Sequence, residues 1–530
     1  MAYIDDITLR QLLEARARED GDRAFCFFED ETITFSALEN RVNRLANGFI
    51  KLGLRAGDRV AVMLPNHPDH IYTLYALAKL GVVFVPVNVN LKGDSLDLLL
   101  NLSDPRAVVA DRRYSDSLRE ALAQRRSVEF LVWRGEGASD IPVRGSTTID
   151  ELSTNSSSAP PAVRGPGPDD VLLLGYTSGT TGVPKGAPLT DRMWRACAFG
   201  CGLASDVRPG EVMLLWEPIY HIGGSQGLHL CLIRRAIVAM LERFSASQFW
   251  DQARRYGATQ IHYLGGILQM LLAQPPRPDD RDHKVRIAWG GGCTTEAWRP
   301  FEERFGVTIH EDYGMTECSS ITTVNTDCKL GSIGKPVDFF EVMVADENGL
   351  PVPVNQFGEI LVRSKQPGLI IKEYFRNPEA TRAAIRSDGW FRTGDLGSID
   401  EEGFLYFHGR TKDCVRRGGE NISAWEVERV INKHPDIEES ALVGVKTDIG
   451  LDDLKIFVKT APGHPHPAPP DLIEWCEGRM PKFQVPRYVA FIDSFDKTPS
   501  QRIKKECLSR STTDCWDHKA SATSEDKQGS

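Results

Sequence analysis

The sequence has no excess of positive charge and no long basic run. Its 530 residues include 63 Lys and Arg against 73 Asp and Glu, which gives a formal net charge of −10. Nucleic-acid-binding surfaces are built from clustered cations, so this balance gives little electrostatic support for a nucleic-acid partner. The composition, with 41% hydrophobic and 26% charged residues, excludes a largely disordered or fibrous protein.

Long hydrophobic runs are missing as well. The best candidate for a membrane span, residues 71–87, is interrupted by Lys79, Gly81 and Pro86, and it is shorter than the ~20 apolar residues that a bilayer requires. Residues 1–6 lack the basic and apolar regions of a signal peptide. We therefore expect neither a transmembrane segment nor a secretory leader.

Cysteine motifs are the third absence. The eleven cysteines are scattered and form no Cys-x-x-Cys pair, and the closest two, Cys197 and Cys201, have no His pair at metal-ligand spacing nearby. The pattern differs from disulfide-rich secreted domains and from zinc sites, and it fits a reducing compartment. We therefore expect a cytoplasmic protein.

The first 110 residues alternate helix and strand patterns. Residues 36–39 have capping-box spacing, and apolar residues follow at helical period until Gly53. Residues 59–64 have a strand pattern. This alternation predicts α/β layers with parallel sheets, and it resumes after a Ser-, Pro- and Gly-rich loop at 153–169.

From Gly358 onward the sequence pattern changes to short β-rich segments. Helix and strand patterns between residues 424 and 492 then predict a separate α+β domain of roughly 100 residues. The last residues, 509–530, are mostly Ser, Thr, Lys and Asp and predict a disordered tail.

The strongest local signal is Tyr176-Thr-Ser-Gly-Thr-Thr-Gly-Val-Pro-Lys-Gly186, directly after the strand-like residues 171–174. Its glycines let the backbone approach an anion, its four hydroxyl residues donate hydrogen bonds, and Lys185 supplies positive charge. It is not a Walker loop, because a glycine rather than Ser or Thr follows Lys185. A flexible Gly/Thr turn is the alternative, and the combination of features favours polyphosphate binding.

This loop resembles the signature loop of the adenylate-forming superfamily, which includes acyl-CoA synthetases, peptide-synthetase adenylation domains and luciferases. Four further segments resemble motifs of that superfamily in the same order, Pro218–His221, Tyr313–Glu317, Trp390–Asp395 and Gly409–Asp413. The resemblance covers roughly residues 8–508.

The resemblance implies an α/β fold with a large N-terminal domain of layered α/β subdomains plus a β-rich subdomain, followed by a small mobile α+β domain. The expected boundaries are 1–408 for the large AMP-binding domain, 409–413 for the hinge, 414–508 for the small domain and 509–530 for the tail.

The resemblance also implies a reaction in two halves, with ATP, Mg²⁺ and coenzyme A. A carboxylate attacks the α-phosphate of ATP to give acyl-AMP and pyrophosphate, and a thiol then displaces AMP. At 4 Å and an effective dielectric of 20, each like-charge pair costs about 4 kcal/mol. Several cations or hydrogen-bond donors are therefore needed around the phosphates.

Roles for individual residues follow from the same resemblance. Glu317 is expected to bind Mg²⁺, which prefers carboxylate oxygen, and Thr316 to donate to the α-phosphate. Asp395 is expected to accept from the ribose hydroxyls, with Arg410 beside it. The alternatives are a helix cap or a surface carboxylate for Glu317, a turn residue for Asp395 and a surface ion pair for Arg410. The β- and γ-phosphates are expected to lie against Thr177, Ser178, Gly179, Thr180, Thr181, Gly182 and Lys185.

The nucleotide and acyl sites are assigned in the same way. His221 is expected to orient or gate the carboxylate, although a His beside aromatics is more often a core residue. The expected adenine and nucleotide contacts are Gly291, Gly292, Cys293, Asp312, Tyr313, Gly314, Met315 and Thr316. The expected acyl pocket consists of Trp216, Tyr220, His221, Trp289 and Gly314.

The small domain is expected to rotate between the two half-reactions. Lys412 falls at the hinge position, and Gly418 and Gly419 are expected along a pantetheine tunnel, where glycine lets the thiol arm pass close to the backbone. Arg416 and Arg417 either meet the CoA phosphates or form a solvated basic patch.

One departure concerns the lysine that bridges the acyl carboxylate and the α-phosphate in this superfamily. Alignment places Gln501 at the motif glycine and Arg502 at the lysine. Arg keeps the charge but is bulkier than Lys. Either Arg502 does the work, Lys504 substitutes from a shifted register, or adenylation is slow, and we favour Arg502.

For the substrate, residues 245–252, 274–286 and 416–423 resemble the crotonobetaine/carnitine–CoA ligase branch. A trimethylammonium acid would favour aromatic faces such as Trp216 and Trp289, with Glu217 adding charge. Other short-chain, medium-chain or aryl acids stay open. So do loading of a carrier protein in trans and a catalytically impaired acyl or nucleotide sensor, and the sequence fixes no oligomeric state.

Overall fold

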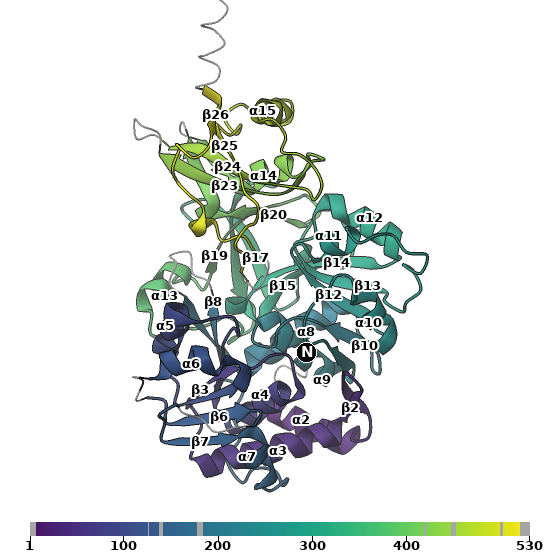
Figure 1. Ribbon diagram of the computed structural model, residues 1–530, viewed down its shortest axis with the longest axis vertical. Helices are drawn as coiled ribbons and strands as arrows, with labels where there is room; N and C mark the ends of the chain where they lie inside the picture. Colours follow the sequence, from purple (N-terminus) through teal and green to yellow (C-terminus); the bar gives the residue numbers. More distant parts are fainter. Residues whose placement is uncertain are drawn as a thin grey trace, which may run out of the picture. The chain divides into compact units, whose positions relative to one another are not determined.

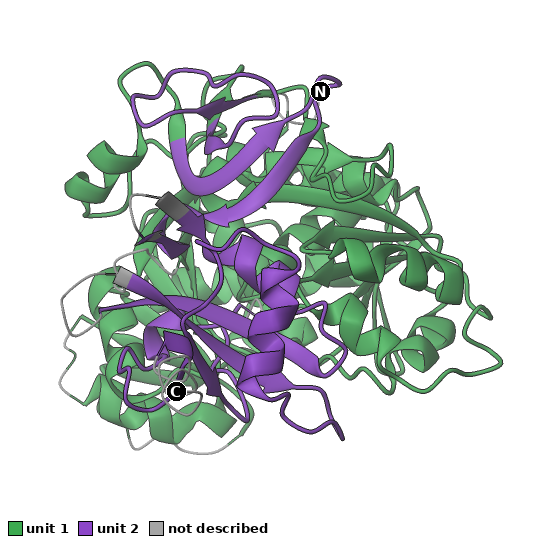
Figure 2. Cartoon of the chain, turned by 90° about the horizontal axis from the view of Figure 1, so that it is seen from above, with its two compact units in different colours: residues 1–341, 362–391 green, residues 342–361, 392–530 purple. Residues whose placement is uncertain are grey.

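The computed structural model describes residues 7–123, 125, 127–136, 141–177, 184–417, 420–446, 452–498 and 502–519. Contacts divide the chain into two units, residues 1–341 with 362–391 and residues 342–361 with 392–530 (Figure 2). The second unit thus takes most of a sheet that precedes residue 408, and the predicted boundary at 408 stays a prediction.

The first unit contains a nine-stranded sheet (Figure 1). Its order is β16 (Lys335–Pro336), β15 (Ser320–Asn325), β14 (Thr308–Met315), β13 (Ile287–Gly291), β12 (Gln260–Leu264), β10 (Val212–Leu215), β11 (Ile237–Met240), β1 (Ala24–Phe28) and β2 (Glu31–Thr34). The strands from β14 to β1 are parallel, and the outer ones are antiparallel. Parallel strands are covered on both faces, which explains their apolar sequences.

A seven-stranded sheet in the same unit carries the predicted phosphate loop. Its order is β7 (Gly145–Thr148), β6 (Phe130–Arg134), β5 (Ala107–Asp111), β3 (Arg59–Met63), β4 (Val83–Pro86), β8 (Val171–Thr177) and β9 (Lys185–Thr190). Only β9 is antiparallel to its neighbour, and Thr177 pairs with Lys185. The predicted loop therefore joins β8 to β9, and residues 178–183 of it lie outside the described residues.

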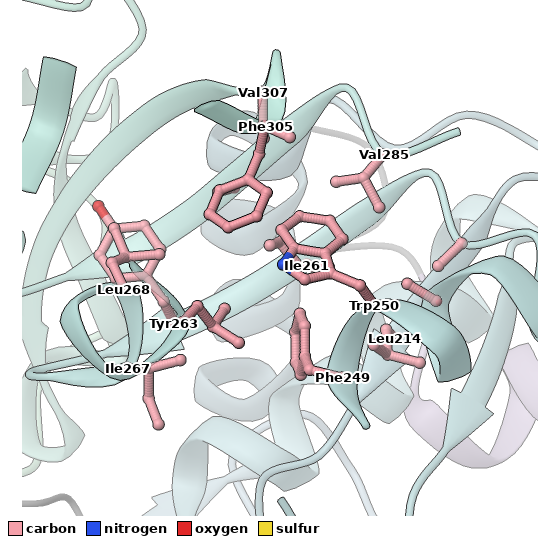
Figure 3. Close-up of a cluster of buried hydrophobic side chains, with 14 of the residues drawn as sticks. Leu214, Phe249, Trp250, Ile261, Tyr263, Ile267, Leu268, Val285, Phe305 and Val307 are labelled. Atoms are coloured by element: carbon pink, nitrogen blue, oxygen red, sulfur yellow. The ribbon is translucent and has the colours of Figure 1, made fainter. Parts of the chain in front are cut away.

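Helices cover both faces of the nine-stranded sheet. On one face, α10 (Phe249–Tyr256), α11 (Ile267–Leu272) and α12 (Thr295–Phe305) contact β10, β12 and β14 (Figure 1). Phe249, Trp250 and Phe305 pack there against Ile261 and Tyr263 (Figure 3).

On the other face, α8 (Asp191–Ser205) contacts β13, β14 and β15, and it also contacts β9 of the seven-stranded sheet. It therefore lies between the two sheets. Side chains are buried around most of the circumference of α8, and the same holds for α4 (Pro68–Leu80) and α9 (Ile222–Arg234). This is typical of helices enclosed between layers. The remaining helices of this unit are α2 (Leu9–Glu19), α3 (Phe35–Leu52), α5 (Gly93–Ser103), α6 (Ser115–Leu122), α7 (Ile149–Thr154) and α13 (Pro378–Ala384).

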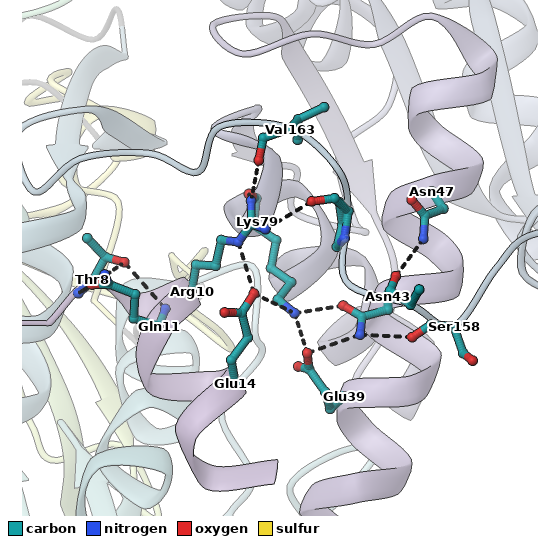
Figure 4. A network of polar contacts seen from close by, with 12 residues as sticks. Thr8, Arg10, Gln11, Glu14, Glu39, Asn43, Asn47, Lys79, Ser158 and Val163 are labelled. Carbon is teal, nitrogen blue, oxygen red and sulfur yellow. Dashed lines mark hydrogen bonds and ion pairs between the residues drawn. The ribbon is translucent and has the colours of Figure 1, made fainter. Parts of the chain in front are cut away.

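A buried lysine ties three of these helices together. Lys79 of α4 is 1% exposed, and its ammonium meets Asn43 at 2.7 Å and Glu39 of α3, with Glu14 of α2 at 3.4 Å (Figure 4). A buried cation is tolerated only when it is paired in this way. Lys79 is thus a structural contact of the first unit.

The start of α3 differs from the prediction. The helix begins at Phe35, and its N-cap is Thr34, whose side chain accepts from the Ala37 N–H. The predicted capping box at residues 36–39 is wrong because an equally good cap lies two residues earlier. The predicted stop at Gly53 is confirmed, with φ at 96° in the left-handed region where glycine is favoured.

The second unit consists mainly of small sheets. One has the order β17 (Phe340–Ala345), β18 (Gly358–Ser364), β19 (Phe391–Ile399) and β20 (Leu405–Arg410), and a hairpin is formed by β21 (Cys414–Arg417) and β22 (Glu420–Ser423). A third sheet joins β23 (Ile437–Lys446), β24 (Asp452–Thr460), β25 (Tyr488–Phe491) and β26 (Trp516–Asp517), with helices α14 (Ala424–Ile431) and α15 (Pro469–Glu477).

Strand β26 contradicts the disordered tail for residues 509–519. Arg487 donates to both carboxylate oxygens of Asp517, at 2.9 and 2.8 Å, and the buried ammonium of Lys455 reaches Asp514 at 2.5 Å. These contacts supply the partners that a buried cation requires. Residues 520–530 lie outside the described residues.

The predicted α/β class, with a large N-terminal domain and a smaller separate one, is confirmed. None of the described helices combines the length and the apolar character needed to cross a membrane.

Candidate active site

Two predicted motifs meet at the end of β8. The Thr177 hydroxyl donates to Glu317 Oε1 at 3.2 Å, although the residues are 140 positions apart. Glu317 lies in the short helix η2 (Thr316–Cys318), directly after β14, and is 6% exposed. Tyr374 donates to the same oxygen at 3.0 Å, and the Lys185 ammonium lies 5.3 Å from the Tyr374 ring centroid.

Tyr374 belongs to a segment that is fixed against η2. The Ile371 N–H donates to the Glu317 carbonyl at 2.9 Å, and the Ser319 hydroxyl donates to the Leu369 carbonyl at 2.7 Å. Burial and the Glu317 carboxylate raise the pKa of Tyr374, so its hydroxyl stays protonated and donates. Tyr374 was not predicted, because an isolated tyrosine carries no spacing signal in the sequence.

The oxygens at this point suit a hard cation. Glu317 offers a carboxylate and Thr177 a hydroxyl beside it. The described parts of the chain contain no cluster of three or more His, Cys, Asp or Glu side chains that would hold a metal alone. Mg²⁺ is commonly held by one or two carboxylates together with substrate phosphates and water. These residues therefore fit Mg²⁺ that is bound with a phosphorylated substrate.

The predicted adenine turn follows β13 and is held by a buried carboxylate. Glu311 of β14 accepts from the Gly292 N–H at 2.6 Å and from the Cys293 N–H at 3.1 Å, and the Tyr263 hydroxyl donates to it as well. Gly292 has φ of 98°, where a side chain would be strained. Burial raises the pKa of Glu311 to about 8, although its donors oppose that shift.

Cys293 sits in this turn with an unreactive thiol. Burial, followed by the nearby Glu311 carboxylate, raises the pKa of Cys293. A protonated thiol is a poor nucleophile, so the geometry supports a packing role for Cys293.

The predicted acyl residues Trp216 and Trp289 both contact His262. The Trp216 indole donates to the His262 carbonyl at 2.7 Å, and the ring centroids of Trp289 and His262 are 4.1 Å apart. Glu217 forms a close ion pair with His262 Nδ1. His262 was not predicted, although a histidine within the apolar residues of strand β12 is a signal that could have identified it.

The other predicted acyl residues lie at element ends. His221 is the N-cap of α9, and its Nδ1 accepts from the Gly223 N–H at 3.2 Å. Tyr220 precedes it, and burial raises the pKa of Tyr220 to about 12. At Gly314 a Cβ would overlap the Ser320 carbonyl oxygen, so the approach of β15 to β14 requires glycine there.

In the second unit, Asp395 and Arg410 form a cross-strand pair between β19 and β20, with 3.3 Å between Arg410 Nε and Asp395 Oδ1. Asp395 is 5% exposed, and its N–H donates to the Thr393 hydroxyl at 3.0 Å. Lys412 lies exposed in the short helix η3 (Thr411–Asp413) after β20.

Arg502 lies exposed on a turn of the same unit, where it and Thr498 exchange hydrogen bonds of 2.7 and 3.1 Å. The Lys504 N–H donates to the Asp496 carbonyl at 2.8 Å. Arg417 is committed to Asp453 at 2.9 Å and to two backbone carbonyls, which supports a structural role for it.

Within the first unit, therefore, the structure brings Thr177, Lys185, Thr316 and Glu317 together, and it places Asp312, Tyr313, Gly314 and Met315 on β14 beside the adenine turn. The predicted residues Ser178, Gly179, Thr180, Thr181, Gly182, Gly418 and Gly419 lie outside the described residues.

Comparisons with known proteins agree with these motifs. A family model for "AMP-binding enzyme" matches residues 13–375, and one for "AMP-binding enzyme C-terminal domain" matches residues 426–502. Crotonobetaine/carnitine–CoA ligase of Salmonella agona is 31% identical over 529 residues, covering 96% of this chain and all of that protein.

Two solved structures extend the comparison. ATP-bound MatB from Rhodopseudomonas palustris has a TM-score of 0.83 and 26% identity, over 94% of this chain and 98% of the other. o-Succinylbenzoate CoA synthetase from Bacillus subtilis, with its acyl-adenylate intermediate, has a TM-score of 0.80 and 27% identity over the same shares.

Proposed function

The chain belongs to the AMP-binding enzyme family and is an AMP-forming acid–thiol ligase, and we propose how its residues divide the reaction. The reaction joins a carboxylic acid to coenzyme A through acyl-AMP and releases AMP and pyrophosphate. The observation that carries the assignment is the hydrogen bond between Thr177 and Glu317, because it joins the phosphate loop to the nucleotide motif.

The first unit supplies the phosphate contacts. Lys185 and the loop before it hold the β- and γ-phosphates, and Thr316 donates to the α-phosphate. Glu317 and Thr177 would hold Mg²⁺, which would supply positive charge beside the triphosphate. Tyr374 is a positioning residue, because its hydrogen bond of 3.0 Å fixes the Glu317 carboxylate.

The second unit supplies the ribose contacts and the residues that change between the half-reactions. Asp395 accepts from the ribose hydroxyls, and Arg410 holds that carboxylate in place at 3.3 Å. Lys412 is the hinge, and Gly418 and Gly419 line the path of the thiol. Arg502 bridges the acyl carboxylate and the α-phosphate during adenylation; its exposed place on a turn supports this role, since the side chain is accessible to a substrate.

The test is AMP release from ATP over a panel of carboxylic acids, each with and without coenzyme A. AMP release that depends on CoA supports the ligase assignment. AMP release that is the same with and without CoA would support carrier loading instead. Loss of all turnover in a folded protein would support the sensor alternative.

Arg502 is tested separately from Lys504. Arg502→Ala is expected to abolish formation of acyl-AMP and to spare thioester formation from supplied acyl-AMP, while Lys504→Ala retains both. Arg502→Lys is the matched control: it keeps the positive charge on the side chain that is usual in this family, and it is expected to retain formation of acyl-AMP. Intact adenylation in Arg502→Ala would show the assignment to be wrong.

We also propose a cytoplasmic location, which the eleven free thiols support. Fractionation of the native host is the test, and recovery in an oxidising compartment would contradict it.

A further inference from the structure

Three buried titratable side chains lie near one another at the carboxyl ends of the parallel strands in the nine-stranded sheet, close enough for the charges of His262 and Glu217 to act on Asp312. Glu217 follows β10, His262 lies on β12, and Asp312 lies on β14; they are 2%, 3% and 7% exposed. In open α/β sheets this edge is where ligands bind.

Strand register places His262 and Asp312 on one face of the sheet. His262 pairs with Trp289, and Trp289 pairs with His310, which is two residues before Asp312. Paired residues of parallel strands, and residues two apart along a strand, point to the same face. This is the face covered by α8, because His310 contacts the Ala204 carbonyl at 2.7 Å.

The two carboxylates of this cluster are incompletely paired. Glu217 Oε2 meets His262 Nδ1 in the close ion pair. Glu217 Oε1 and Asp312 Oδ2 are buried, and no described residue donates a hydrogen bond to either. A buried polar atom without a partner costs free energy, so a bound group that donates to these oxygens would be favoured.

The position of Asp312 relates this cluster to the substrate. Thr316 contacts the α-phosphate in the proposed function, and Gly314 is among the residues expected at the acyl pocket, so the acid would extend back along β14 toward Asp312. The Asp312 side chain is thereby assigned to the acyl end, in place of the nucleotide contact expected from the sequence. A strand rises about 3.3 Å per residue, which puts Asp312 about 7 Å beyond Gly314. The expected acyl residues Trp216 and Trp289 both contact His262, and the rings of Trp289 and His262 are tilted by 57° to each other.

We propose that Asp312 and Glu217 bind an ammonium group with N–H donors at the far end of the substrate acid. This inference rests on the proposed ligase function. A primary or secondary ammonium supplies the hydrogen bonds that the two oxygens lack and balances a cluster of two acids and one histidine. A trimethylammonium group has no N–H to donate, and a plain hydrocarbon end would leave both oxygens unpaired.

The experiment compares matched acids by kcat/KM for CoA-dependent AMP release. Each set contains an ω-amino acid, its methyl-ended isostere and its N-trimethyl counterpart; 6-aminohexanoate with heptanoate and 4-aminobutyrate with γ-butyrobetaine are examples. Sites built to hydrogen-bond a substrate group reject analogues that lack it, so we expect a preference of at least about 100-fold for the amino acid in one set.

Variants assign that preference to the cluster. Asp312→Asn and Glu217→Gln are each expected to lower it at least about tenfold. The preference is a ratio of two kcat/KM values measured on the same variant, so an effect of the substitution on ATP binding or on the amount of folded enzyme cancels from it. The control is Asp116→Asn, the same change at a side chain that is 91% exposed, and it is expected to leave the preference unchanged.

Equal or better use of the methyl-ended or trimethyl acids overturns the proposal, and so does a preference that both cluster variants retain. In those cases the enzyme still turns over, so the ligase function stands. Absence of CoA-dependent AMP release with every acid overturns the proposal and the ligase function together.

Discussion

Glu311 and Asp312 are neighbours on β14, and their surroundings differ completely. Both are buried, at 3% and 7% exposure, and burial raises the pKa of Glu311 to about 8 and that of Asp312 to about 7. Glu311 accepts from two backbone N–H groups and from Tyr263. Asp312 faces the other side of the sheet, where its Oδ2 has no donor among the described residues.

The difference separates two uses of a buried acid. A carboxylate with several donors fixes the backbone that supplies them, as Glu311 fixes the adenine turn. A carboxylate with an unused oxygen gains most when a ligand supplies the donor. Burial and pKa are similar for both residues, so hydrogen-bond pairing is the property that distinguishes them.

The largest effect is expected for Glu311→Ala. The change leaves the Gly292 and Cys293 N–H groups and the Tyr263 hydroxyl without their acceptor. Each buried group that loses its partner costs about 1–3 kcal/mol, so we expect a loss of at least about 3 kcal/mol and a KM for ATP raised more than about tenfold. Urea unfolding and initial rates measure these changes.

The control for that variant is Glu311→Gln, which keeps the size of the side chain and one acceptor oxygen. We expect its loss of stability to be less than half that of Glu311→Ala. If Asp312→Ala destabilised the protein as strongly as Glu311→Ala, the distinction between the two acids would be wrong.

Asp312→Asn is expected to have the opposite sign. At pH 8 the wild type holds a largely ionised, incompletely paired carboxylate, and the amide removes that buried charge. We expect the variant to be equal to the wild type or more stable, by up to about 2 kcal/mol without substrate. Thermal unfolding at pH 8 measures this, and destabilisation by more than about 1 kcal/mol would mean that Asp312 has a partner in the protein.

Much of the fold follows from the sequence because local patterns and tertiary packing agree there. The strand at 59–64, the stop at Gly53 and the α+β character after residue 424 all appear as expected. The predicted cap at residues 36–39 failed, since several hydroxyl residues compete for one helix start. The tail at 509–519 failed because Lys455 and Arg487 recruit it from distant strands.

The site divides in the same way. Lys185 and Glu317 could be predicted from the sequence, because each lies in a loop or motif whose other residues are its neighbours along the chain. Tyr374 and His262 matter through contacts with residues far away in the chain. Only the strand register shows that Glu311 and Asp312 face opposite sides of the sheet, so their separate roles required the structure.

The stability of the protein is expected to depend on pH. The pKa values of Glu311, Asp312 and His262 are all raised by the fold. Burial is the main cause for the two acids. For His262 burial lowers the pKa, and the Glu217 and Asp312 carboxylates together raise it by more. The folded chain therefore holds protons that the unfolded chain releases. These protons contribute fully to the free energy of unfolding at low pH, and their contribution is lost as pH rises through the folded pKa values. The stability of the wild type therefore falls between about pH 6 and 8.5.

Glu311→Gln and Asp312→Asn each remove one of these titrations. Relative to the wild type, on going from pH 6 to 8.5, Glu311→Gln is expected to gain about 2.5 kcal/mol and Asp312→Asn about 1.4 kcal/mol, because each pH unit below the folded pKa corresponds to about 1.4 kcal/mol. Urea midpoints at the two pH values measure the change. A wild-type curve that rises over this range would contradict the assignment.

The smallest effect is expected for Tyr263→Phe, which removes one of the three donors to Glu311 and leaves the two backbone donors. A single hydrogen bond contributes about 1 kcal/mol net, so the loss of stability should be near that value and the KM for ATP should change less than about threefold. The pKa of Glu311 should also rise, because the Tyr263 hydrogen bond lowers it. Unfolding across pH 6 to 8.5 measures both changes, and the fall in stability should move to higher pH. A loss as large as that of Glu311→Ala would mean that the tyrosine, rather than the two backbone donors, holds the carboxylate in place.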